Sequence, residues 1–215
     1  MSMTKIVIID YGVGNLLSVK QAFESFKVNV RISSDPKLII ESSHAVLPGV
    51  GAFGDAMKAL KKYGLTEIIK EIGISGKPLL GICLGMQLLL DESSEFGKTI
   101  GLGLLPGKVI PIPKVSKKGT PLKAPNIGWG KLEPRESPNN WVGTALEEVK
   151  ENESLYFVHS FMAIPKNLKF VIAETDFGGN KIPSVISNRN IIACQFHPEK
   201  SGPTGLKILR RFCEY

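Results

Sequence analysis

Three residues of this chain have the types and the spacing of a nucleophilic catalytic site. Cys83 lies between two glycines in the run Gly-Ile-Cys-Leu-Gly, and His197 and Glu199 lie two residues apart near the other end of the chain. A thiol can attack a carbonyl carbon once an imidazole takes its proton, and a carboxylate can fix the tautomer of the imidazole and stabilise its cation. Cysteine, histidine and carboxylate in this order predict a thiol that performs acyl transfer.

The segments around Cys83 predict a turn that presents its sulfur. Residues 79–83 form a short apolar run that favours a strand buried on both faces, and residues 84–90 favour a helix packed against it. The flanking glycines permit a sharp strand-to-helix turn, as in a nucleophile elbow, and a helix N-terminus behind the sulfur favours the thiolate. A cysteine after an apolar strand is more often only a small buried side chain. The catalytic interpretation therefore depends on His197, which ends the apolar run 190–196.

The composition indicates one globular domain over residues 1–215. This length is at the upper end of what a single core supports, and a hydrophobic content of 43% with a mean hydropathy of +0.07 is ordinary for such a domain. No apolar run approaches the roughly 20 residues of a membrane span, and the first residues lack a signal-peptide pattern. Three cysteines without paired spacing suit a reducing compartment. We therefore expect a cytoplasmic protein with no membrane partner.

The chain carries a net charge of +7 and has a pI near 9.3. Such a charge suggests nucleic acid as a partner, but no recognised binding motif or arginine-rich stripe accompanies it. The lysines are scattered along helices or bunched in residues 114–123, which favours a solvated surface or a basic face for an acidic partner subunit. The acids in residues 91–95 are also expected to be solvated, because no histidine or cysteine spacing supports a metal. We expect no nucleic acid, metal or cofactor.

Strands and helices alternate along the first half of the chain. The expected strands span residues 5–10, 28–32, 44–48 and 79–83, and the expected helices span residues 16–26, 53–62 and 65–72. This alternation predicts an α/β fold with a doubly wound, mostly parallel sheet of the flavodoxin-like kind, flanking helices, and a site at the carboxyl ends of the strands.

The second half of the chain predicts an antiparallel extension of that sheet. Five prolines within residues 104–132 leave only short strands and turns there, with an exposed tip at residues 117–120. A polar loop is expected at residues 136–143, strands at residues 154–158, 170–175, 183–187 and 191–196, and a closing helix at residues 206–213.

Two motifs resemble those of the class I, or triad, glutamine amidotransferases: residues 81–87, Gly-Ile-Cys-Leu-Gly-Met-Gln, and residues 195–199, Gln-Phe-His-Pro-Glu. Residues 10–15, 48–53 and 156–160 are similar to the glutaminase subunits of imidazole glycerol phosphate synthase, and the resemblance runs from about residue 5 to the last helix. It implies that Cys83, His197 and Glu199 hydrolyse L-glutamine to glutamate and ammonia without a cofactor. It further implies a heterodimer with a (β/α)₈-barrel cyclase, which uses the ammonia in histidine biosynthesis to make imidazole glycerol phosphate and AICAR.

The mechanism and the resemblance together predict the remaining site residues. The N–H of Leu84, directly after the nucleophile, is one expected oxyanion donor, and the resemblance implies that Gly49 or Val50 supplies the other. His159 lacks a carboxylate two residues further on, so His197 is the expected base. The resemblance also implies a set of residues that hold glutamine, namely Gly51, Gln87, Ser160 and Phe161. It implies that the synthase subunit is faced by Asn15, Asn126 and Trp129.

Three alternatives remain open at this stage. A related amidotransferase could deliver ammonia to a sugar-modifying synthase of surface polysaccharide biosynthesis, since Asn126 and Gly130 depart from the pattern Pro-His-Met-Gly-Trp-Asn that is usual at residues 125–130. A thiol hydrolase of the gamma-glutamyl type would have the same fold and would act alone. A regulator without enzymatic activity would keep only the interface, but the intact triad argues against it.

Overall fold

The central sheet is covered on both of its faces. The computed structural model describes residues 4–137 and 141–215, so the loop expected at 136–143 lies partly outside the described residues. In strand β1 (Lys5–Ile9), Ile6 and Ile8 enter one hydrophobic core, whereas Val7 and Ile9 enter a second core. Successive side chains of a strand face opposite sides of the sheet, so an apolar run of this kind is stable only where both faces are packed.

The large sheet of the described residues has eight strands in the order β2-β1-β3-β4-β14-β13-β12-β9. The strands from β2 to β14 pair in parallel, and those from β14 to β9 pair antiparallel. Their bounds are β2 (Asn29–Ser33), β3 (His44–Gly49), β4 (Leu79–Cys83), β14 (Ile191–Cys194), β13 (Asn180–Asn188), β12 (Val171–Phe177) and β9 (Glu133–Pro134). The mostly parallel sheet with an antiparallel extension agrees with the sequence-based prediction.

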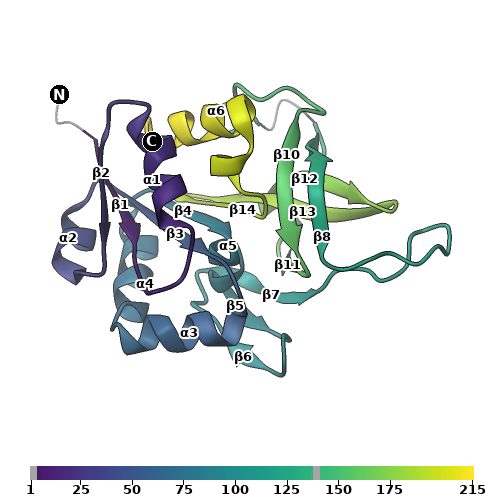
Figure 1. Ribbon diagram of the computed structural model, residues 1–215, viewed down its shortest axis with the longest axis horizontal. Coiled ribbons are helices and arrows are strands. Elements are labelled where there is room, and N and C mark those ends of the chain that lie inside the picture. Colours follow the sequence, from purple (N-terminus) through teal and green to yellow (C-terminus); the bar gives the residue numbers. More distant parts are fainter. Residues whose placement is uncertain (1–3, 138–140) are drawn as a thin grey trace.

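Helices form a layer on each side of this sheet (Figure 1). Helices α1 (Leu16–Glu24) and α6 (Gly202–Phe212) cover one face, where the rings of Phe23 and Phe212 lie 6.2 Å apart. Helices α3 (Phe53–Lys62) and α4 (Thr66–Ser75) bury Leu60 and Ile69 in the core on the other face. The shorter helices are α2 (Pro36–Glu41), α5 (Leu84–Leu88), η2 (Leu168–Phe170) and η3 (Pro198–Lys200).

Two smaller sheets form a wall beside the carboxyl end of β4. One has the order β11-β7-β5-β6, and in the other β10 pairs antiparallel with β8. Their bounds are β5 (Leu90–Ser93), β6 (Thr99–Ile100), β7 (Leu105–Pro111), β8 (Asn126–Lys131), β10 (Ser154–His159) and β11 (Phe161–Pro165). Strand β10 ends at His159 and β11 begins at Phe161, so this junction brings the segment around Ser160 towards the nucleophile.

The segment after Cys83 differs from its prediction. A helix was expected over residues 84–90, but α5 ends at Leu88 and strand β5 begins at Leu90. The three leucines 88–90 are all fully buried. A short apolar run that is buried on every side has no periodicity that separates a helix from a strand. The closing helix likewise begins at Gly202 rather than at residue 206, because Pro203 is compatible with a first helical turn.

Two structural facts relate to the expectations on membrane spans and on the cysteines. None of the described helices is long and apolar enough to cross a membrane. The cysteines Cys83, Cys194 and Cys213 are free.

Close packing of backbone against backbone holds α5 beneath the site. A Cβ atom placed on Gly85 would lie 1.8 Å from the carbonyl oxygen of Leu47 in β3. Strand β3 pairs with β1 on one side and with β4 on the other, so it cannot move away to make room. The nucleophile turn therefore needs glycine at position 85.

We expect Gly85→Ala to lower the free energy of unfolding by about 3 kcal/mol or more, or to prevent folding, because a backbone oxygen occupies the space. Gly54→Ala is a matched control. Both glycines are the second residue of a helix, but the nearest atom to a Cβ at Gly54 is the Thr99 hydroxyl oxygen at 3.5 Å. Urea denaturation of both variants measures the difference, and equal stabilities would contradict this account.

Candidate active site

Cys83 occupies a strained turn at the carboxyl end of β4. Its φ is 53° and its ψ is −110°. Residues with a Cβ atom rarely adopt this backbone conformation, which costs about 1–3 kcal/mol. Strands β3 and β14 hold β4 from both sides, and this pairing maintains the strain. The turn directs the sulfur into a cavity.

His197 is fixed by contacts on its backbone and on one ring nitrogen. Its N–H donates to the carbonyl oxygen of Tyr156 at 2.9 Å, and its own carbonyl oxygen accepts from the Ser201 hydroxyl at 2.6 Å. The ring Nδ1 lies 2.8 Å from Oε1 of Glu199, whose side chain is almost completely buried. The buried Nε2 has no hydrogen-bond partner among the described residues, and the Cys83 side chain, which lines the same cavity, influences the ring electrostatically. The structure thus brings the sulfur, the imidazole and the carboxylate together at one site, and their catalytic roles stay predictions.

The surroundings of His197 keep its imidazole protonated. Burial lowers the pKa of His197, but the interactions with Cys83 and Glu199 outweigh burial and raise it to about 9. The imidazole is therefore protonated at neutral pH beside the sulfur, and it can give a proton to a leaving group.

A cavity of about 340 Å³ opens above the sulfur. It has the volume of a small-molecule site and is large enough for a free amino acid. Most of the site residues expected from the sequence line it: Val50, Gly51, Cys83, Leu84, Gln87, Ser160, Phe161 and His197. Segments from four distant parts of the chain therefore meet at the carboxyl ends of the parallel strands, where ligands bind in such folds.

The glycine loop after β3 lies directly beside the nucleophile turn. Gly49 is paired with Cys83 in the sheet, and a Cβ atom on Gly49 would lie 2.6 Å from the hydroxyl oxygen of Tyr11. That hydroxyl donates to the carbonyl oxygen of Pro48 at 2.7 Å, and burial raises the pKa of Tyr11, so it stays a neutral donor. Tyr11 thus supports the loop from below, while Val50 reaches the cavity. The oxyanion roles of Gly49, Val50 and Leu84 stay predictions.

A chain of buried amides reaches the sulfur from the opposite side. The Gln87 amide nitrogen donates to the carbonyl oxygen of Phe161 at 3.1 Å and to Oε1 of Gln195 at 3.0 Å. This contact orients Gln195, whose amide nitrogen lies 3.8 Å from the Cys83 sulfur. Gln195 was not among the site residues expected from the sequence. The available signal was the strand expected at residues 191–196, whose alternation would place Gln195 on the same side as His197.

The expectation of a solvated acidic surface at residues 91–95 is wrong for Glu95. Its Oε2 accepts from the backbone N–H of Phe53 at the N-terminus of α3 at 2.7 Å, and its side chain lines the catalytic cavity. A carboxylate is favoured at a helix N-terminus, which explains why it is drawn inward. The expectation failed because the strand β5, which carries the chain back towards the site, was not foreseen.

His159 lines the same cavity, but its ring nitrogens contact other residues of the cavity wall and are not available for proton transfer. Its Nδ1 lies 2.9 Å from the carbonyl oxygen of Phe161, and its Nε2 lies 3.1 Å from the Asn126 amide nitrogen. Burial lowers the pKa of His159 to about 4, although the Phe161 carbonyl opposes this shift. The ring is therefore neutral, with both nitrogens occupied, and the role of His197 as the base stays a prediction.

The three residues expected at a subunit interface lie outside the cavity lining. Asn126 is turned inward to His159, and the Asn15 amide oxygen accepts from the Ser18 hydroxyl at 3.0 Å at the start of α1. Trp129 is exposed on β8 and packs edge-on against Tyr156. Their role at an interface stays a prediction.

No group of His, Cys, Asp and Glu side chains within residues 4–137 and 141–215 is arranged to hold a metal ion. The residues of the site offer a buried cysteine sulfur beside a protonated imidazole, a carboxylate that orients the imidazole, and nearby backbone amides. Such a site can cleave a carboxamide through a thioester.

Comparisons with known proteins agree with this geometry. The family model for glutamine amidotransferase class-I matches residues 7–214. The structure of PurLQS from Thermotoga maritima superposes with a TM-score of 0.73 at 18% sequence identity, and the match covers 99% of each chain. A glutamine amidotransferase from the same organism superposes with a TM-score of 0.62 at 18% sequence identity, and this match covers 93% of this chain and 77% of that one. These two likenesses show the fold. The chain belongs to the class-I glutamine amidotransferases.

Curated relatives define the branch within this class. A protein of Legionella pneumophila strain Lens, named imidazole glycerol phosphate synthase subunit HisH 1, is 48% identical over 212 residues, which cover 99% of this chain and 100% of that protein. The imidazole glycerol phosphate synthase subunit HisH of Geobacter sulfurreducens is 45% identical over 213 residues, covering 99% of both chains. The chain thus groups with the HisH subunits.

We expect Glu199→Gln to move the alkylation profile of Cys83 to higher pH. The carboxylate helps to raise the pKa of His197 to about 9, so its loss should return that pKa towards the ordinary 6.5 and remove the imidazolium between these values. Alkylation by iodoacetamide at pH 7.5 should then be about tenfold slower, because a thiolate without a cationic partner is less populated. The rate is followed by mass spectrometry of the Cys83 peptide, and an unchanged profile would contradict the coupling.

We expect Gln195→Leu to reduce glutaminase turnover about tenfold, because the sulfur loses a hydrogen-bond donor. A variant that lacked only packing would lower the melting temperature and leave the pH dependence of Cys83 alkylation unchanged. The donor role predicts that this profile also moves to higher pH. Gln87→Met, which releases the Gln195 amide but does not touch the sulfur, should show the same shift to a smaller extent.

Proposed function

We propose that this chain is the glutaminase subunit of imidazole glycerol phosphate synthase, which hydrolyses L-glutamine and passes ammonia to a (β/α)₈-barrel cyclase in histidine biosynthesis. The observation that carries the proposal is that Cys83 and His197 line one cavity and that Glu199 contacts Nδ1 of His197. The HisH names of relatives that match nearly the whole chain support the pathway. The proposal implies a cytoplasmic enzyme that needs no cofactor.

The reaction proceeds through a glutamyl thioester. With the proton of the Cys83–His197 pair on Nε2, the sulfur attacks the carboxamide carbon as a thiolate. Nε2 gives this proton to the departing nitrogen, and the C–N bond breaks so that ammonia leaves. A water molecule then loses a proton to Nε2 and attacks the thioester carbon, and the C–S bond breaks to release glutamate and restore the pair. Glu199 holds the ring throughout, and N–H groups from Leu84 and the glycine loop stabilise the oxyanion at each tetrahedral stage.

The cavity offers matching groups for the amino-acid end of glutamine. Glu95 uses Oε2 for the helix α3 and leaves its other oxygen and its charge for the ammonium group of the substrate. Gly51, Ser160 and Phe161 supply backbone groups around the same space, and the Gln87 side chain is held in place by Phe161 and Gln195. This arrangement favours a free amino acid over a longer peptide.

The ammonia must leave towards a partner. The outer face of the β8–β10 pair borders the cavity, because Val158 lines it and pairs with Ile127. Ile127 and Trp129 are each 61% exposed on this face. Large apolar side chains gathered beside a reaction cavity favour coverage by another subunit. The proposed cyclase would seal the mouth there.

The two departures at residues 126 and 130 do not support a change of partner. Asn126 is turned to His159, and a Cβ atom on Gly130 would lie 2.8 Å from the Thr175 hydroxyl oxygen and 2.9 Å from the Phe157 ring. Both positions therefore face the interior, whereas the exposed Ile127 and Trp129 lie between them. The departures thus give no support to a sugar-modifying synthase, and the HisH names of the relatives favour the cyclase.

The proposal predicts low glutaminase activity for the chain alone and at least a tenfold increase when the cyclase and its nucleotide ligand are added. Glutamate release is measured in a coupled assay. Full turnover by the isolated chain would favour an independent hydrolase instead. Cys83→Ser, which keeps the size of the side chain, should remove the activity under both conditions, and a residual rate equal to that of the unchanged chain would refute the thiol mechanism.

A further inference from the structure

A projecting hairpin holds more than half of the net charge of this protein. We call residues 113–125, between β7 and β8, the basic arm; they include Lys114, Lys117, Lys118 and Lys123 and no aspartate or glutamate. The arm thus carries four of the seven net positive charges. Figure 1 shows it extending away from the rest of the molecule beyond the ends of β7 and β8.

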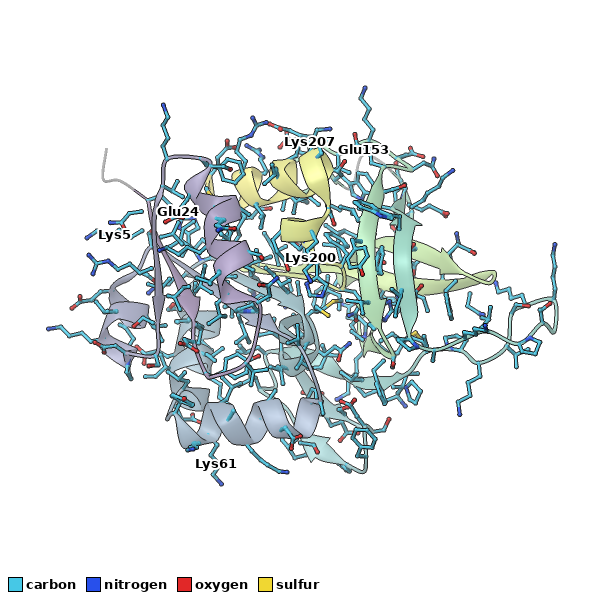
Figure 2. All side chains as sticks on the ribbon, in the orientation of Figure 1. Lys5, Glu24, Lys61, Glu153, Lys200 and Lys207 are labelled. Atoms are coloured by element: carbon cyan, nitrogen blue, oxygen red, sulfur yellow. The ribbon has the colours of Figure 1, made fainter. Side chains whose placement is uncertain are left out.

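The four lysines have no acidic partner within the described residues, and all four are exposed. Many other lysines of the chain do have one. Lys207 lies 2.9 Å from Glu153, and Lys58 and Lys70 bind acids on their own helices. Lys207 and Glu153 are labelled next to each other at the top of Figure 2. Four like charges within 13 residues repel one another and raise the free energy of the isolated chain. An acidic surface that approaches the arm would relieve this repulsion.

The backbone of the arm is ordered by its own contacts. The N–H of Leu122 donates to the carbonyl oxygen of Lys114, and the N–H of Ser116 donates to that of Thr120, each at 2.8 Å. The arm also rests on the turn between β12 and β13, where the Lys117 N–H donates to the Gly178 carbonyl oxygen at 2.9 Å. An ordered backbone presents the lysines without the entropic cost of first fixing a loose loop.

The arm is continuous with the mouth of the active site. It returns to the body at Pro125, which lines the catalytic cavity, and β8 continues directly into the exposed Ile127 and Trp129. A subunit that covers these two side chains to receive ammonia is therefore brought against the base of the arm. Exposed charges beside an apolar interface accelerate encounter and fix orientation more than they add affinity.

We propose that the basic arm is an electrostatic docking element that contacts an acidic surface of the ammonia-accepting subunit. The inference rests on the proposed function, because it takes the cyclase as the occupant. It adds that the cyclase presents carboxylates beside the rim of its apolar contact, and that the arm controls the rate of association rather than the chemistry.

The test compares two pairs of adjacent lysines, one in the basic arm and one at the end of α3. Lys117→Glu/Lys118→Glu changes the arm, whereas Lys61→Glu/Lys62→Glu changes the end of α3 by the same charge. Both pairs are exposed and without an ion pair in the described structure, and Figure 2 places Lys61 on the far side of α3, away from the arm. Association with the purified cyclase is followed by stopped-flow fluorescence at about 50 mM and about 500 mM NaCl, where screening differs strongly.

We expect the arm variant to associate about tenfold more slowly at low salt and to lose most of the salt dependence, while the α3 variant stays within about twofold of the unchanged chain. Glutaminase activity at saturating cyclase should be equal in all three proteins. Equal association rates for the two variants would overturn the role of the arm and leave the proposed function intact. Absence of any cyclase binding by the unchanged chain would overturn both.

The same proteins are titrated with a double-stranded oligonucleotide. Little or no binding is expected from the unchanged chain. Binding that the arm variant loses, together with unaltered cyclase association, would show that the arm recognises phosphates and would overturn the docking role.

Discussion

The arrangement of the site depends on the strained backbone at Cys83. The φ of Cys83 is 53°, and this conformation is stable only because β4 pairs with a parallel strand on each side. It also requires that α5 lies directly against β3 at Gly85, where no side chain separates them. The folding energy of the central sheet is thus used locally to direct the buried sulfur of Cys83 into the cavity.

From that turn, two sets of contacts radiate to opposite walls of the cavity. On one wall, the paired position of Gly49 and the hydroxyl of Tyr11 hold the glycine loop next to the nucleophile. On the other wall, Gln195, Gln87 and the Phe161 carbonyl connect the sulfur to the β10–β11 junction. Because Asn126 and His159 continue this second set of contacts to β8, the strand proposed to face the cyclase is linked to the nucleophile by side chains of known position.

The sequence was sufficient for the parts of the fold whose periodicity is unambiguous. The strands around β1, β3 and β4 and the helices α3 and α4 follow from apolar runs and amphipathic spacing. The candidate triad was predicted from residue types suited to thiol acyl transfer, and the structure brings these residues together. The strand β5 could not be foreseen, since the buried leucines 88–90 have the same pattern in either conformation. The inward turn of Glu95 and the contact of Gln195 with the sulfur depend on tertiary packing between distant segments, which spacing along one chain does not encode.

The neutral imidazole of His159 has a consequence for how this enzyme can be studied. Its two nitrogens are committed to Phe161 and Asn126, and it gains a proton only near pH 4. The second histidine of the cavity therefore keeps one charge state across the whole range in which the enzyme would be assayed. Kinetic titrations between mild acid and mild alkali thus need no correction for His159.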